Sequence, residues 1–399
     1  MCSNVRPRRG QTTTALRRWL AYACAFVALS VATTANATVV TKCSSEDTQE
    51  KFQSQAKALL TDFAVGGFVH LQSQDSVVSL ELDSRFHKFA TFEFPGVGEF
   101  NLALESVALP KGGQGELVSV QTSSRREILL AMVHPARDFQ LPSCDLSALV
   151  EHIGVRQNIA AWTESLSWGW PDGGPAYWNT HYWNKGTPIN LNETSQSLRD
   201  AFQNPQAYAL GCYTAAKMVY AQAVLDFYER VLQDQEKTQL VLNRLLRDAD
   251  PLVHIEPPKM WEFYPEYDAK EEGISGKLLR IEYGVASQSI VPGDWLYAVN
   301  DDPKSAQKTG YEGSNAIYVG MDRFASYYEP EGPRYTTLEK INDVYQWRHG
   351  VFNRPADAYK EEAVSSEFLA ELMNPPSEGG LLVPIRVVPY FFGFEPLPE

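Results

Sequence analysis

The feature that most constrains the fold is a cysteine that stands directly before a long helical run. From residue 213 to about 233, apolar side chains recur at three- and four-residue spacing, and an Asn204-Pro205 turn precedes the run. Cys212 is therefore predicted at a helix N-terminus, where unpaired N–H groups and the helix dipole favour a thiolate and lower the thiol pKa. Two interpretations stay open, a nucleophile or a small buried residue that begins a core helix.

Residues 1–37 are interpreted as an export signal. Five arginines and no acid are followed by an apolar run from residue 19 to about 32 and by Ala35-Asn36-Ala37, a small-x-small cleavage site. The apolar run is short for a membrane anchor, although an uncleaved anchor stays open, and Arg17-Arg18 also fits a twin-arginine signal. We predict an exported protein, periplasmic or secreted, without stable membrane insertion.

The charge of the chain limits its partners. The 399 residues carry a formal charge of −14, and loss of the five signal arginines takes it to −19. Such an acidic chain is not expected to bind nucleic acid or an anionic membrane. It suits an exported protein with a basic or lysine-rich partner, although acidity that serves only solubility is the plainer interpretation.

Removal of the signal leaves three cysteines, Cys43, Cys144 and Cys212. In an oxidising compartment two of three can pair, and Cys43 and Cys144 bracket one segment. Their pairing would close a loop of about 100 residues, worth roughly 4–5 kcal/mol. Cys212 would then remain the free thiol; a different pair, or none, stays open.

Residues 38–150 are predicted to form a β-rich accessory domain. After a short helix at 51–63, apolar runs with turn signals between them predict strands. These runs lie at 68–71, 77–82, 89–94, 100–104, 117–120 and 128–133. His70, His87 and His134 lack metal-ligand spacing and are interpreted as structural, so no metal site is expected here.

An aromatic-rich Gly/Pro loop follows a helical segment at 146–166. Trp168, Trp170, Tyr182 and Trp183 could line a substrate groove, or they could form a rigid aromatic plug. The acidic, aromatic segment at 260–268 reads as an insertion or lid, or as a solvated loop.

Residues 151–399 are predicted as a thiol domain with a C-terminal extension. The helix after Cys212 and a second at 235–247 precede strands at 292–299, 314–320 and 324–327. Papain-like thiol enzymes follow this order. Further helices are expected at 336–349 and 358–373, and the proline-broken apolar stretch 380–393 is expected at a sheet edge or bend.

Several motifs point to a family. In order, they are His181-Tyr182-Trp183, Ser197-Leu198-Arg199-Asp200, Ala207-Tyr208-Ala209-Leu210-Gly211-Cys212, Gly293-Asp294-Trp295-Leu296-Tyr297, Asp302-Pro303-Lys304-Ser305-Ala306-Gln307 and Gly313-Ser314-Asn315-Ala316-Ile317-Tyr318-Val319-Gly320. Over about residues 180–330 they resemble the small bacterial (spore-coat type) protein-glutamine gamma-glutamyltransferases. The last strand pair is also similar to the wider NlpC/P60 group. The fold expected is α+β: a β-rich N-terminal domain, then a papain-like, NlpC/P60-type helix-on-antiparallel-sheet domain.

The resemblance implies acyl transfer on protein. The Cys212 thiolate would attack the carboxamide of a protein glutamine, release ammonia and form a thioester. A lysine or other amine would complete a crosslink, and water would give deamidation. No metal or organic cofactor is implied.

The sequence departs from the family at the base. The family places a glutamate where this chain has Ser314, and a histidine where it has Tyr327; a serine is no general base near neutral pH. Glu312, His254 or His349 could replace the base. Alternatively, the helix dipole suffices with help from Tyr327 or Asp294, or the site is inactive.

Two other functions stay open at this point. One is a cell-wall thiol peptidase or amidase, which the lack of a histidine at position 314 weighs against. The other is a catalytically inactive secreted binding protein on the same fold.

Overall fold

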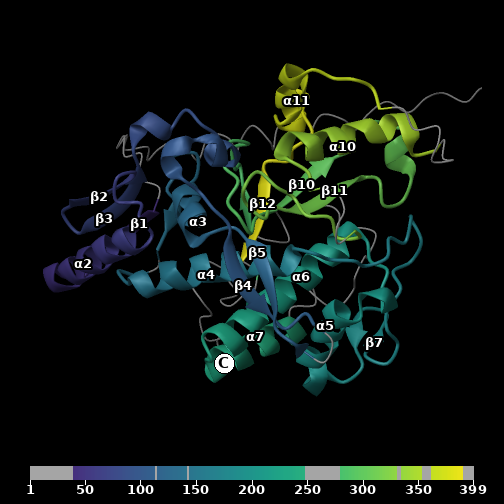
Figure 1. Ribbon diagram of the computed structural model, residues 1–399, viewed down its shortest axis with the longest axis horizontal. Coiled ribbons are helices and arrows are strands. Elements are labelled where there is room, and N and C mark those ends of the chain that lie inside the picture. The colour runs from purple at the N-terminus through teal and green to yellow at the C-terminus, as the bar shows by residue number, and fades with distance from the viewer. Residues whose placement is uncertain are drawn as a thin grey trace, which may run out of the picture. The chain divides into compact units, whose positions relative to one another are not determined.

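The computed structural model is an α+β protein built on two four-stranded sheets (Figure 1). It describes residues 39–112, 115–141, 143–247, 279–329, 334–352 and 361–389. The predicted export signal, the segment at 260–268 and His254 lie outside these residues. Contacts group residues 37–399 as one compact unit, and a division near residue 150 stays a prediction.

The strands are β1 (Val39–Lys42), β2 (Val69–Gln74), β3 (Val77–Leu82), β4 (Glu105–Leu109), β5 (Val118–Thr122), β6 (Phe139–Gln140), β7 (Trp183–Asn184), β8 (Thr187–Pro188), β9 (Leu279–Tyr283), β10 (Trp295–Val299), β11 (Gly313–Ile317) and β12 (Ile385–Pro389). The α-helices are α2 (Glu46–Asp62), α3 (Arg125–Met132), α4 (Leu146–Thr163), α5 (Thr194–Gln203), α6 (Cys212–Asp226), α7 (Gln235–Arg247), α10 (Thr337–Gly350) and α11 (Ser366–Leu372). A π-helical turn at Phe227–Val231 extends α6.

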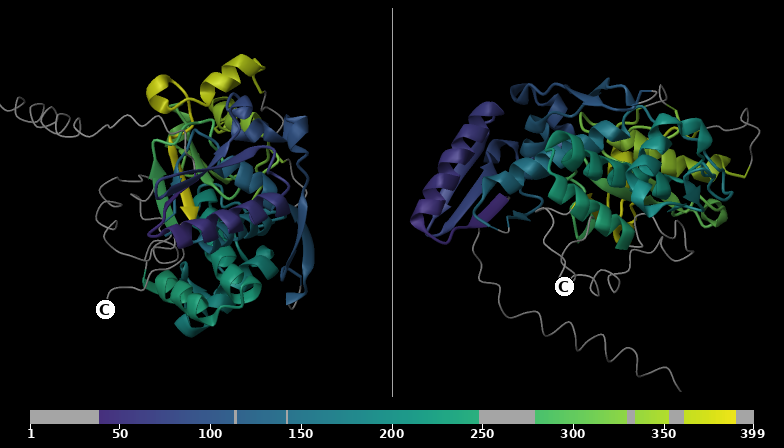
Figure 2. Two further views of the ribbon diagram at one scale, coloured as in Figure 1. Left: turned by 90° about the vertical axis from the view of Figure 1, so that its left-hand side faces the viewer. Right: turned by 90° about the horizontal axis from the view of Figure 1, so that it is seen from below.

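The first sheet has the strand order β2-β3-β1-β6, and α2 lies along it (Figure 2). Helix α2 begins at the cap residue Ser45, whose hydroxyl accepts the Thr48 N–H, and it buries Phe52. A disulfide joins Cys43, after β1, to Cys144, before α4. The predicted pairing of these two cysteines is confirmed.

Three of the strands predicted before residue 150 are wrong. The run at 128–133 lies in helix α3, which Ser124 caps by accepting the Glu127 N–H. Because all of 127–132 is buried, periodicity could not separate a buried strand from a buried helix. The run at 89–94 enters a 3₁₀ segment, Thr91–Gly96, and the extended pairing expected at 100–104 begins only at β4.

The second sheet is antiparallel throughout, with the order β11-β10-β12-β9, and helices cover both faces. Trp295, Ile317 and Val387 pack into the core that contains α6, whereas Leu296 and Ala316 pack into the core that contains α10. Figure 1 shows α6 and α10 on opposite sides of β10 and β11. Strand β11 is one of the two edge strands of this sheet.

The C-terminal apolar stretch supplies a central strand, so the expected edge position is wrong. Strand β12 lies between β10 and β9. Its prolines permit this because Pro384 precedes the strand and Pro389 is its last residue, which leaves the interior N–H groups intact.

Most of the predicted helices fit the structure, whereas the one expected at 358–373 is shorter: of its described residues, Ser366–Leu372 form α11 and 361–365 are not helical. Helix α6 begins at Cys212 as expected, α7 has the expected bounds, and α10 lies within one residue of its prediction. In the part of the chain that is described, none of the helices has the length and apolarity needed to cross a bilayer.

Candidate active site

The segment before α6 is held as an extended strand-like piece by the aromatic loop. Gly169 N donates to Tyr208 O at 2.9 Å, and Leu210 N donates back to Gly169 O at 3.0 Å. On the other side, Tyr177 and Ala209 exchange both backbone hydrogen bonds. A Cβ at position 169 would meet the Ala209 Cβ at 3.1 Å, so glycine permits this close approach. The loop thereby fixes where Cys212 enters the helix.

The thiol of Cys212 meets the free edge of β11. Asn315 donates to Cys212 Sγ twice, from its backbone N at 3.5 Å and from Nδ2 at 3.6 Å. Tyr318 N donates to Asp294 O, so the Tyr318 amide points toward β10. Successive amides along a strand point to opposite sides, and Asn315 lies an odd number of residues from Tyr318, so its amide points away from β10. This N–H on the free edge of the sheet therefore donates its hydrogen bond to the sulfur.

A tryptophan sets the orientation of the Asn315 carboxamide. Trp295 Nε1 donates to Asn315 Oδ1 at 2.9 Å. An indole N–H can only donate, so the atom it faces must be the carboxamide oxygen, and the NH₂ group must face the sulfur. Trp295 and Asn315 are both buried. The second donor to Sγ is thus held in place by the core.

The electrostatic balance at the thiol differs from the expectation from sequence. Burial raises the pKa of Cys212 above its usual value, and the two Asn315 N–H groups, the Lys340 charge and the Tyr213 amide oppose that rise without cancelling it. Cys212 is half-buried. The prediction of a lowered pKa was wrong because the helix N-terminus is desolvated as well as positive.

Cys212 opens into a cleft of about 280 Å³ between β11, α10 and the aromatic loop, which we call the Cys212 cleft. It is rich in aromatic side chains. Its lining residues are Trp170, Cys212, Gly310, Tyr311, Ser314, Asn315, Ala316, Ala325, Ser326, Tyr327, Tyr328, Glu329, Tyr335, Lys340, Asp343 and Trp347. No described histidine is among them.

The residues predicted as a replacement base lie elsewhere. Glu312 Oε2 accepts from Gly310 N at 2.8 Å, and Glu312 does not line the cleft. His349 pairs with Glu362 at 3.1 Å, also outside the cleft. Ser314 does line it. The structure therefore brings the serine, but neither Glu312 nor His349, to the cleft.

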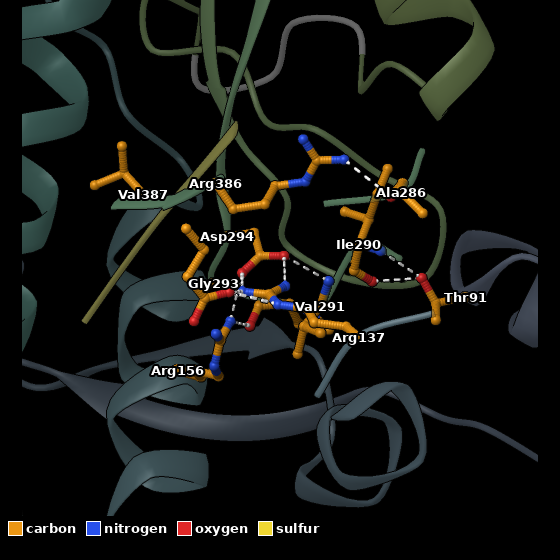
Figure 3. Close-up of polar contacts among 12 residues, drawn as sticks. Thr91, Arg137, Arg156, Ala286, Ile290, Val291, Gly293, Asp294, Arg386 and Val387 are labelled. Atoms are coloured by element: carbon orange, nitrogen blue, oxygen red, sulfur yellow. Dashed lines mark hydrogen bonds and ion pairs between the residues drawn. The ribbon is translucent and has the colours of Figure 1, made fainter. Parts of the chain in front are cut away.

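Asp294 is a buried structural ion, and the predicted assisting role at the thiol has no support in its position. Its carboxylate accepts from Arg137 at 2.7 Å, from Arg156 at 2.8 Å and from Val291 N at 2.9 Å (Figure 3). Burial alone would raise the pKa of Asp294, but the two guanidinium charges outweigh it and lower the pKa to about 2. Asp294 thus ties α4 to the turn that enters β10.

Of the four aromatic residues predicted to bind substrate, the structure brings Trp170 alone to the cleft. Trp170 packs against Tyr328 there, with ring centroids 5.2 Å apart. Trp168 and Trp183 are 1% exposed and donate their indole N–H groups to Ala201 O and to Ser197 O. Both support the alternative of a rigid plug.

Two predicted site residues remain, the substrate-binding candidate Tyr182 and the catalytic candidate Tyr327, and they differ in position. Tyr182 accepts a hydrogen bond from Gln196 at 3.3 Å and does not line the cleft. Tyr327 does line it, and its backbone oxygen accepts from Trp168 N at 3.1 Å. Burial raises the pKa of Tyr327 well above its usual value, and Cys212 and Tyr220 add to the rise. Its phenol therefore stays protonated and can act only as a donor or as a weak acceptor.

Sequence reasoning missed Asn315, Lys340 and Asp343. Asn315 is the residue after Ser314, and its polar side chain beside the apolar residues Ala316 and Ile317 was the available signal. Lys340 and Asp343 face the cleft from α10, which no local pattern links to Cys212. Within the described residues, no three His, Cys, Asp or Glu side chains converge as a metal site requires.

Comparison with known proteins gives one family. Residues 113–343 match the sequence model of the family described as protein-glutamine gamma-glutamyltransferase. No curated protein matches significantly. Among solved structures, the chain is similar to a transglutaminase from Geobacillus stearothermophilus (without C-terminal extension). That match has 19% identity and a TM-score of 0.38, and covers 62% of this chain and 95% of that one.

Proposed function

We propose, from the premise that this chain belongs to the protein-glutamine gamma-glutamyltransferase family, that it is exported and crosslinks proteins through a thioester on Cys212. Family membership supports protein-glutamine acyltransferase activity in general. The finer proposal concerns the nucleophile, the acceptor and the compartment. The observation that carries it is the Cys212 thiol, which begins α6, faces a cleft and accepts two hydrogen bonds from Asn315.

The proposed reaction has two balanced steps. In the first, Cys212 Sγ attacks the glutamine side-chain carbonyl carbon, the C–S bond forms, the C–N bond breaks, and the thiol proton leaves with ammonia. In the second, an amine attacks the thioester, the C–S bond breaks, and one amine proton returns to the thiol. Water in place of the amine yields glutamate, which is deamidation.

The donors around the sulfur support this chemistry. Hydrogen bonds from Asn315 favour the thiolate over the thiol, because an anion accepts more strongly than a neutral group. The thiolate is the attacking form. Tyr327 Oη is buried and makes no hydrogen bond to another described residue. We infer that it donates to the substrate carbonyl oxygen.

The acyl-transfer test uses incorporation of a fluorescent alkylamine into casein, with ammonia release measured in parallel. The chain should be produced from Thr38 onward. We expect incorporation by the wild type and loss to background in Cys212→Ala and Cys212→Ser, with both variants folded by circular dichroism. Equal incorporation by wild type and Cys212→Ala would contradict the proposal. Ammonia release without incorporation would assign deamidation instead.

Export is supported by the order of the first 37 residues and by the Cys43–Cys144 disulfide, since such bonds persist in oxidising compartments. The acidic mature chain suits a lysine-rich acceptor protein. N-terminal sequencing of the exported protein should begin at Thr38. Retention in the cytoplasm with an intact N-terminus would contradict the proposed export, whatever the activity.

A further inference from the structure

The Cys212 cleft contains three charged side chains among its described lining residues, Glu329, Lys340 and Asp343. Lys340 is the single cation of this set. Buried thiol nucleophiles usually share their site with a cation, because a nearby positive charge favours the thiolate. Because no described histidine lines the cleft, Lys340 is the candidate for that cation.

Lys340 is confined beside the edge of β11. Its Nζ lies 3.0 Å from Asp343 Oδ2, one turn further along α10, and 5.0 Å from the centre of the Tyr335 ring. Its side chain is 18% exposed. Lys340 and Ser314 together line both the Cys212 cleft and a small apolar cavity on the α10 side of the sheet. The ammonium is thus held in the cleft rather than free in solvent.

We propose that Lys340 is the counter-charge of the Cys212 thiolate, and that Asp343 and Tyr335 are the residues that position it. The proposal deepens the function proposed above, because it assumes that the thiolate is the working form of Cys212. It assigns to an ammonium on α10 the role that an imidazolium has in other thiol enzymes. Lys340 acts on the sulfur by charge alone and moves no proton.

The electrostatics agree with this assignment. Burial by itself would lower the pKa of Lys340, but Asp343, Tyr335 and Cys212 raise it above its usual value, so the ammonium persists. The same charge opposes the rise that burial causes in the pKa of Cys212.

The other ionisable side chains around the thiol are phenols and carboxyl groups. Burial raises the pKa values of Tyr297 on β10, of Tyr327 and of Tyr335, so these phenols stay neutral. The carboxyl groups of Glu329 and Asp343 face the same cleft. Neither can stabilise a thiolate, which leaves Lys340 as the favourable charge in the described cleft.

The test is the pH-rate profile of Cys212 alkylation by iodoacetamide in folded protein, measured for Lys340→Met and Lys340→Arg. The methionine variant should react roughly three- to tenfold more slowly near pH 7, with its midpoint moved to higher pH, as expected for loss of one nearby charge. The arginine variant should stay close to wild type. Lys308→Met is the matched control, because Lys308 pairs with Asp172 outside the cleft lining.

Profiles of Lys340→Met and wild type that superimpose would overturn the proposal, as would an arginine variant that behaves like the methionine one. If Lys340→Met fails to fold by near-ultraviolet circular dichroism, Lys340→Gln provides the same comparison. Amine incorporation is measured separately. Its absence from the wild type refutes the acyltransferase proposal, whereas the alkylation profiles alone decide the role of Lys340.

Discussion

The buried carboxylate of Asp294 allows a quantitative prediction about stability. Asp294 is 0% exposed and faces two arginines, Arg137 and Arg156, which are also buried. Asp294→Asn keeps the shape of the side chain and removes its charge. Both guanidinium groups would remain in the interior, with Glu282 as the remaining acidic partner of Arg137. Loss of one member of a buried ion pair typically costs about 3–5 kcal/mol.

The pKa of Asp294 provides a second route to the magnitude. It falls from 3.8 to about 2 in the folded protein, which corresponds to roughly 2–3 kcal/mol at a little over 1 kcal/mol per pKa unit. Because the folded-state pKa is the lower one, this stabilisation is complete above about pH 4 and is lost as the pH falls through about 2. The two routes agree on a loss of a few kcal/mol at neutral pH.

The assay is urea unfolding followed by tryptophan fluorescence and circular dichroism at pH 7 and at steps down to pH 2. We expect Asp294→Asn to lose about 3 kcal/mol at pH 7 and the difference from wild type to shrink at low pH. Asp75→Asn, in an exposed turn with φ 54°, is the control and should stay within about 0.5 kcal/mol. A loss below about 0.5 kcal/mol at pH 7 for Asp294→Asn, or a difference that grows on acidification, would refute the reasoning.

Three further predictions concern the site and the disulfide. Asn315→Leu should slow both Cys212 alkylation and amine incorporation at least tenfold, about 1.4 kcal/mol, because the sulfur loses its Nδ2 donor; unchanged rates would contradict that role. Trp170→Ala should raise KM with little loss of stability, whereas Trp168→Ala should destabilise the fold by about 3–5 kcal/mol, and thermal melting with steady-state kinetics separates the two. Reduction of Cys43–Cys144 should lower the free energy of unfolding by about 2–5 kcal/mol. A free energy of unfolding that reductant leaves unchanged would mean that the bond does not form in solution.

Much of the local structure followed from sequence patterns. The helix start at Cys212, the bounds of α7 and α10, and the strands β10 and β11 were predicted from periodicity and turn residues. The pairing of Cys43 with Cys144 was the favoured one of three possible pairs, because these two cysteines bracket one segment, and the structure contains it. These features depend on residues close together in the chain, or on a small number of possible pairings, so a single sequence is sufficient to infer them.

The local patterns failed where burial hides the period. Helix α3 is buried over 127–132, so its apolar run resembled a strand. Strand β12 lies at the centre of its sheet because its prolines fall at Pro384 and Pro389, which bracket the ladder rather than interrupt it. In both cases the structure that the segment adopts, a helix for α3 and a central strand for β12, depends on neighbours that are distant in sequence.

The sequence by itself determined where the candidate nucleophile stands, at the start of a helix with a strand pair to follow. Only the tertiary structure decided its environment: Asn315 bonded to the sulfur, Lys340 held in the cleft by Asp343, and Asp294 buried away from it. The physical reason is that the charge state of a thiol depends on burial and on groups within a few ångströms. These groups come from β11, which packs on α6, and from α10, which lies on the other face of the sheet, and no local stretch of sequence encodes this arrangement.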